Sequence, residues 1–131
     1  MTIRPTDRWR KRIETEAQQI AAGELAASEA YYAARYGDAV TPAEEAFRVF
    51  EEELKTLATA SDDHVFAAVE RVAVALNTID AECGVGFDTL DREDLCDYID
   101  ASLSGAGIDV DALAARRGIG RAEITDEWRD W

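Results

Sequence analysis

Acidic side chains recur along one segment with a spacing that could bind a divalent cation. Four aspartates follow one another at every third residue: Asp91, Asp94, Asp97 and Asp100. Carboxylates on one face of a helix can bind magnesium for phosphoryl chemistry. A helix turns by ~100° per residue, however, so residues three apart do not lie directly above one another. The acidic side chains therefore spread around the helix, and the centre of their spread lies opposite the apolar Leu95. The pattern is therefore typical of a solvated outer face rather than of a metal site.

A second acidic stretch, residues 44–53, is similar to the Glu-Glu-x-x-Glu run of all-helical nucleotide pyrophosphohydrolases. That resemblance would imply a metal-dependent phosphohydrolase. Here, however, Arg48 follows Glu44-Glu45, and Lys55 follows Glu51-Glu52, at the place of the third carboxylate. Only Glu53 borders the apolar face of this segment. The pattern favours surface ion pairs, which contribute little stability.

The C-terminal part of the chain contains one motif-like string. Leu113–Trp128 resembles the turn of a helix-turn-helix, which would imply a DNA-binding regulator. Arg117 and Glu127 stand where such motifs place apolar residues. The second helix of the motif would also carry acidic side chains toward the phosphates of DNA. We therefore interpret the string as a helical corner that packs on the rest of the chain.

The residues that most often bind zinc or act as nucleophiles are few and isolated. Cys83, Cys96 and His64 are the only cysteines and the only histidine, and no CxxC pair exists. This predicts no disulfide framework, no metal site and no cofactor. Both cysteines have the sequence context of small buried hydrophobic residues.

Aromatic residues mark both ends of the chain. Trp128 and Trp131 are three residues apart, and Trp9 lies near the other end. Their expected role is to anchor the two termini to the core. The alternative is that the C-terminal pair docks on a partner, because tryptophan is over-represented among interface hot spots.

The charge of the chain is strongly acidic and unevenly distributed. The 28 acidic residues outnumber the 14 basic ones, for a net charge of -14. Residues 1–12 balance at +4, residues 13–60 at -7, residues 61–111 at -11, and residues 112–131 at zero. Such a charge repels nucleic acid and anionic membranes and attracts basic protein surfaces.

The first helix is expected to begin at Pro5 with Thr6 as its cap, and to end at Gly37-Asp38. An unbroken helix over residues 7–36 would be about 45 Å long at ~1.5 Å per residue. That length exceeds a domain whose radius of gyration is roughly 14 Å. The helix must therefore kink, with Gly23 as the expected place, or project and pack on a second copy in a homodimer.

The remaining helices have clearer signals. The second helix is expected to start at Pro42 with Thr41 as its cap and Glu44 completing a capping box, and Ser61 is expected to cap the third helix. Further helices are expected over residues 91–103 and 110–117, and a last one from residue 121 or 125 to residue 131. No alternating strand pattern is present. The prediction is one acidic domain over residues 1–131, all-α, with compact orthogonal or bundle-like packing of five to six helices.

These observations together predict a non-enzymatic protein-interaction module, such as an inhibitor or immunity-type protein that covers a basic partner. The alternatives are the metal-dependent phosphohydrolase and the helix-turn-helix regulator. No membrane span or signal peptide is expected, so the predicted location is the reducing cytoplasm. The candidate partner-binding residues are Asp94, Asp97, Asp100, Glu51, Glu52, Trp128 and Trp131.

Overall fold

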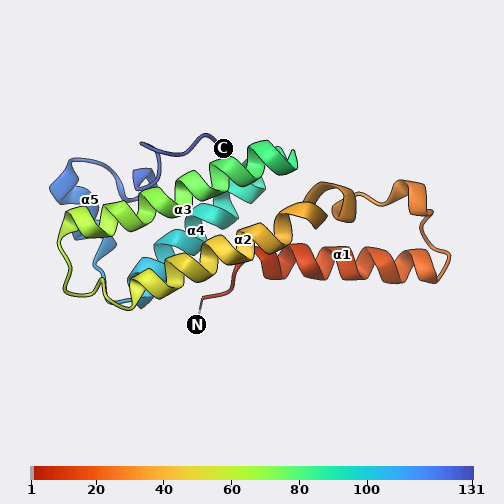
Figure 1. The fold of residues 1–131 in the computed structure, drawn as a ribbon, viewed down its shortest axis with the longest axis horizontal. Coiled ribbons are helices and arrows are strands. Elements are labelled where there is room, and N and C mark those ends of the chain that lie inside the picture. Colours follow the sequence, from red (N-terminus) through yellow and green to blue (C-terminus); the bar gives the residue numbers. More distant parts are fainter. Residues whose placement is uncertain (1) are drawn as a thin grey trace.

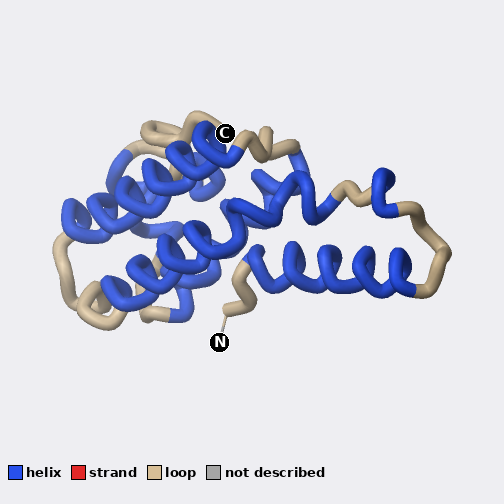
Figure 2. The backbone as a smooth tube through the Cα atoms, turned by 45° about the vertical axis from the view of Figure 1, so that its right-hand side comes forward, coloured by secondary structure: helices blue, strands red, loops and turns tan. Residues whose placement is uncertain are grey.

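The computed structural model describes residues 2–131, and all regular structure in that range is helical (Figures 1 and 2). The elements in chain order are α1 (Pro5–Ala21), the short 3-10 helix η1 (Ala27–Glu29), α2 (Tyr32–Leu54), α3 (Asp62–Cys83), α4 (Thr89–Gly105), α5 (Val110–Arg117) and the 3-10 helix η2 (Arg121–Glu123). The all-α prediction with five to six packed helices is confirmed.

The start of α1 differs from the expectation. Thr6 lies inside the first turn and is fully buried, so it does not cap the helix. Pro5 takes the first helical position, where its missing N–H costs nothing. The Asp7 carboxylate accepts the backbone N–H of Arg4 at 3.1 Å and thereby satisfies one donor of the helix start.

The long first helix breaks close to the predicted position. α1 ends at Ala21, and Gly23 has a φ of +75°, a left-handed conformation that favours glycine. The chain then reverses through η1 into α2. In Figure 1 the distal part of α1 and this connection extend beyond the ends of α3 and α4.

A side chain of α1 caps the N-terminus of α2 from outside. The buried Glu16 carboxylate accepts backbone N–H groups of Tyr31, Tyr32 and Ala33 at 2.7, 3.0 and 3.1 Å. These donors have no partner within their own helix. Their hydrogen bonds, that of Tyr32 foremost, hold the pKa of Glu16 below its usual range.

The predicted boundary between the first two helices is wrong. α2 runs without interruption through Gly37, Asp38 and Thr41, and Pro42 lies inside it. A proline in a helix cannot donate to the carbonyl four residues earlier, which here belongs to Asp38. The Cys83 thiol donates to that carbonyl oxygen at 3.6 Å and supplies the missing partner.

Helices α3 and α4 form as expected, and together with α2 they build most of the core. The Ser61 hydroxyl caps α3 by accepting the His64 backbone N–H at 3.3 Å. α3 lies along α2 and buries eight side chains, among them Val69 and Leu76. α4 begins at Thr89, two residues before the expected start, because the Asp88 carboxylate caps it.

The C-terminal segment does not form the predicted helix over residues 121–131. After α5 the chain contains only η2 and turns as far as Trp131. Asn77 of α3 holds this segment by donating to the Trp128 carbonyl at 2.7 Å and accepting the Asp130 N–H at 2.9 Å. Residues 118–131 therefore contain no recognition helix after the turn of the motif.

Within residues 2–131, no helix combines the length and the apolar composition that crossing a membrane would need.

Candidate functional site

Two of the predicted partner-binding acids contact the basic start of the chain itself. Arg4 donates through Nε and one terminal nitrogen to Glu51 at 2.9 and 2.7 Å. Arg8 donates to Asp94 at 2.6 Å. Arg10 of α1 makes a similar paired contact with Glu44 of α2. The positive start of α1 therefore lies on the acidic α2 and α4 of its own chain.

Glu51 also links α2 to α4. The buried Tyr98 of α4 donates its hydroxyl to Glu51 at 2.6 Å. The hydrogen bond from Arg4 holds the pKa of Glu51 below its usual range, whereas burial raises the pKa of Tyr98. This network ties three helices together, which is a structural role.

The other predicted acids are Glu52 on α2 and Asp97 and Asp100 on α4. Asp100 accepts two hydrogen bonds from Arg121, at 2.8 and 2.7 Å, and Glu52 pairs with Lys55 within α2. Asp97 is exposed and has no ion pair within residues 2–131. The predicted acids thus lie on two helices, Glu51 and Glu52 on α2 and Asp94, Asp97 and Asp100 on α4.

The tryptophans lie against the core. Trp131 is only 7% exposed, packs edge-on against Phe87 and donates to the Ala73 carbonyl at 3.5 Å. Trp9 stacks on the same ring, so that Phe87 contacts tryptophans from both ends of the chain. Trp128 is half-buried next to Phe66.

The carboxylates that a phosphohydrolase would bring together are held by different arginines. Glu53 accepts from Arg71 of α3, and Asp94 accepts from Arg8 of α1. Across residues 2–131, no group of three or more histidine, cysteine or acidic side chains has an arrangement that could hold a metal ion.

An apolar groove of about 400 Å³ lies between α2 and α3. Its floor contains small or apolar side chains from both helices, and its rim contains charged ones. The residues that line it are Pro42, Glu45, Ala46, Val49, Phe50, Glu53, Arg71, Val72, Ala75, Thr78, Ile79 and Glu82. Val49 is 40% exposed, so the groove presents an apolar side chain to solvent.

The rim of this groove contains an acceptor without a donor. Glu53 uses one carboxylate oxygen, Oε1, to accept from Arg71 Nε at 2.7 Å. Its other oxygen, Oε2, is shielded from solvent and accepts no hydrogen bond within residues 2–131. A buried carboxylate oxygen without a donor is costly, so the Glu53 side chain gains if it turns Oε2 outward to a cationic or N–H donor.

The charge around the groove is negative after internal pairing. Among residues 2–131, eleven of the fourteen basic side chains are in ion pairs, and fifteen of the 28 acidic side chains are not. Four of these fifteen are exposed on α2 and α3: Asp38, Asp63, Glu70 and Glu82. Glu82 lines the groove itself.

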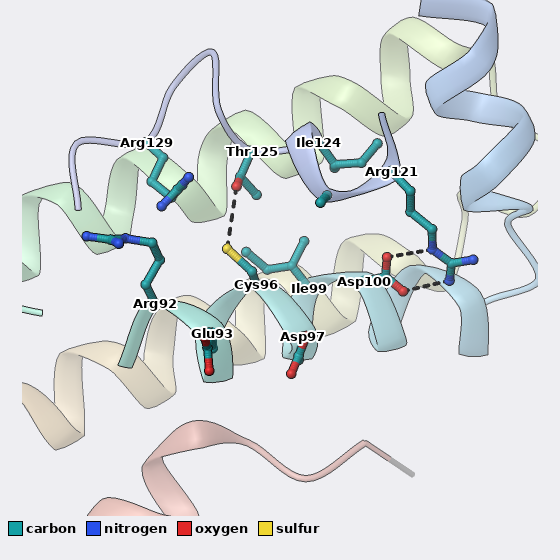
Figure 3. Close-up of a pocket in the computed structure, with 11 residues that line it drawn as sticks. Arg92, Glu93, Cys96, Asp97, Ile99, Asp100, Arg121, Ile124, Thr125 and Arg129 are labelled. Carbon is teal, nitrogen blue, oxygen red and sulfur yellow. Dashed lines mark hydrogen bonds and ion pairs between the residues drawn. The ribbon is translucent and has the colours of Figure 1, made fainter. Parts of the chain in front are cut away.

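A second hollow, of about 500 Å³, lies between α4 and the C-terminal segment (Figure 3). Apolar side chains form part of its wall, together with three arginines and three acids. The residues that line it are Arg92, Glu93, Cys96, Asp97, Ile99, Asp100, Arg121, Ala122, Ile124, Thr125 and Arg129. Figure 3 shows Arg92 and Arg129 at one end and the Arg121–Asp100 pair at the other.

The cysteine in this hollow is not set up as a nucleophile. Burial raises the pKa of the Cys96 thiol, which keeps the sulfur protonated at neutral pH. Its Sγ lies 3.8 Å from the Thr125 hydroxyl. Both Cys83 and Cys96 are free thiols.

Sequence reasoning singled out Glu53 but missed Val49, Arg92 and Arg129. Val49 is adjacent to the buried Phe50. The only signal in the sequence is that this valine falls outside the apolar stripe of its helix. The position of Arg129 depends on the C-terminal segment folding back on α3 and α4, for which the sequence contains no local signal.

Comparison of the chain with protein-family models, with curated proteins and with solved structures finds no match in any of the three.

Proposed function

We propose that this chain is a non-enzymatic interaction module, of inhibitor or immunity type, whose acidic α2–α3 face binds a basic partner. The observation that carries the proposal is the unpartnered Glu53 Oε2 on the rim of an apolar groove. A partner that fits presents an arginine or lysine to Glu53 and an apolar side chain to Val49.

The groove favours a helical segment as the part of the partner that docks. α2 and α3 lie side by side with small residues, Ala46 and Ala75, between them. Grooves of this kind accept the apolar face of an amphipathic helix. Glu82, which lines the groove without an ion pair, would meet a basic residue on the flank of that helix, and the negative surplus of the chain would speed its association. Free cysteines are compatible with a partner in the reducing cytoplasm.

The test uses a fluorescent amphipathic helical peptide of leucine and lysine, with a glutamate-for-lysine version as its charge control. Anisotropy should report binding of the lysine peptide that weakens as salt rises. Glu53→Gln should weaken it about fivefold, or roughly 1 kcal/mol, while Glu14→Gln, which neutralises an exposed acid on α1, should change it less than twofold.

Matched valine substitutions localise the site. Val49→Lys places a positive charge and a long side chain in the groove, whereas Val74→Lys makes the same change on α3 outside the groove, at a valine that is 45% exposed. The proposal requires that Val49→Lys abolish binding and that Val74→Lys leave most of it. Equal effects of the two changes, or equal affinity for both peptides, would overturn it.

A further inference from the structure

The hollow between α4 and the C-terminal segment has a composition that the interaction-module proposal does not use. It combines an apolar wall with two arginines whose donors are not all satisfied. We infer that this hollow is a binding site for a small amphipathic carboxylate, with the carboxylate at Arg92 and Arg129 and the apolar body against Ile99 and Ile124.

The guanidinium groups of Arg92 and Arg129 each keep a donor without an acceptor. The Nε atoms of Arg92 and Arg129 are both shielded from solvent, and neither has a hydrogen-bond acceptor within residues 2–131. Arg92 makes no ion pair there either, although the chain has a large surplus of acids. No acceptor within residues 2–131 contacts the terminal nitrogens of Arg92 either, so its guanidinium can take an acceptor that carries negative charge.

Arg129 is also fixed in place. One terminal nitrogen donates to Asp126 at 2.7 Å, the other donates to the Trp131 carbonyl at 2.9 Å, and the guanidinium lies over the Trp131 ring. These contacts orient the side chain and leave Nε free. A preoriented arginine binds a carboxylate without a further loss of side-chain freedom.

The acids of the same hollow do not block an anion. Asp100 is neutralised by Arg121 through two hydrogen bonds. Figure 3 shows Glu93 and Asp97 pointing away from the C-terminal segment, while Thr125 and Arg129 point toward α4. Glu93 and Asp97 therefore lie on the outer lip of the hollow, away from Arg129.

The remainder of the hollow fits an apolar body. Its volume of about 500 Å³ is in the range of small-molecule sites. Ile99 and Ile124 are buried in its wall, and Cys96 and Ala122 add small contacts. The Thr125 hydroxyl next to Cys96 offers one further polar contact. A ligand with one carboxylate and a short apolar chain matches this distribution.

The test uses octanoate as the probe, with 1-octanol as the neutral compound of equal chain length. Calorimetry and amide chemical shifts of the whole chain should show octanoate binding in the hollow and a much weaker response to octanol. Arg92→Gln should weaken octanoate binding about tenfold, because a hydrogen bond to a charged group is lost. Arg12→Gln removes an unpaired arginine of α1 and should change the affinity less than twofold.

A second measurement follows the rate at which the Cys96 thiol is alkylated. In a Cys83→Ser background, octanoate should slow alkylation of Cys96, and Arg92→Gln should remove that protection while circular dichroism stays unchanged. Several results would each overturn the inference: no binding at millimolar octanoate, equal binding of octanol, shifts confined to the α2–α3 groove, or full protection in Arg92→Gln. The peptide experiment above does not involve this hollow, so either proposal can fail alone.

Discussion

At the scale of single residues, the most constrained polar group is Asp91. It is 3% exposed and accepts hydrogen bonds from the Tyr36 hydroxyl at 2.9 Å and from Arg35 at 2.9 Å. Arg35 also donates to the carbonyls of Val85 and Gly86, in the loop before α4. This buried cluster fixes α2 to the start of α4, and breaking it leaves charge without a partner.

We expect Tyr36→Phe to lower the free energy of unfolding by roughly 2 kcal/mol, because Asp91 loses a hydrogen bond to a charged acceptor. Urea unfolding at neutral pH measures this difference. Tyr32→Phe is the matched control: the Tyr32 hydroxyl makes no hydrogen bond within residues 2–131, so its loss should cost less than about 0.5 kcal/mol. Equal losses for the two variants would show that burial of Asp91 is not the cause.

The hydrogen bond between Tyr36 and Asp91 also makes the stability of the chain depend on pH in a defined direction. Burial raises the pKa of Asp91 above its usual range, and the Tyr36 hydroxyl opposes that rise. Because the folded pKa is higher than the unfolded one, ionisation of Asp91 reduces stability as pH rises through the interval between them. Tyr36→Phe raises the folded pKa further, so its deficit should shrink as pH falls through that interval. A deficit that is unchanged at about pH 4 would contradict this explanation.

At the scale of elements, the least expected feature is the continuous α2. The sequence places a threonine and a proline where a helix commonly starts, and local propensity predicts a boundary there. In the structure, burial of Ala39, Val40 and Ala43 on one face keeps the helix continuous. The thiol of Cys83 then satisfies the carbonyl that Pro42 leaves free.

Pro42→Ala should therefore raise the free energy of unfolding, by about 1–2 kcal/mol. An interior proline costs a helix about 3 kcal/mol, and part of that gain is offset because alanine makes the unfolded chain less restricted. Pro5→Ala is the matched control, since Pro5 takes the first position of α1 and its replacement should bring no gain. Thermal unfolding followed by circular dichroism compares the two. A loss of stability in Pro42→Ala would favour a helix start at this position.

The elements that were predicted correctly are those whose signals are local. α3 and α5 have an apolar stripe and a capping side chain in sequence, at Ser61 and Asp109. The C-terminal segment was predicted as a helix because its composition permits one, but its backbone is held by Asn77 instead. The groove and the hollow were not predictable, because each depends on how two distant segments pack together.

At the scale of the whole molecule, part of the charge of the chain is neutralised by ion pairs within the fold. Arg4, Arg8 and Arg10 pair with Glu51, Asp94 and Glu44, so the basic start neutralises acids of α2 and α4. The surplus of negative charge remains on the outside of the helices. Two copies would therefore repel each other over most of their surfaces.

We accordingly expect light scattering to give the mass of one chain at both low and high salt. In the alternative arrangement, the basic start of one copy would lie on the acidic body of another, and the dimer would dissociate as salt rises. Arg10→Glu separates the cases: it would prevent such a dimer, but in a monomer it removes only an exposed ion pair with Glu44. A dimer at low salt that Arg10→Glu abolishes would assign the first helix to an interface between copies rather than to the fold of one chain.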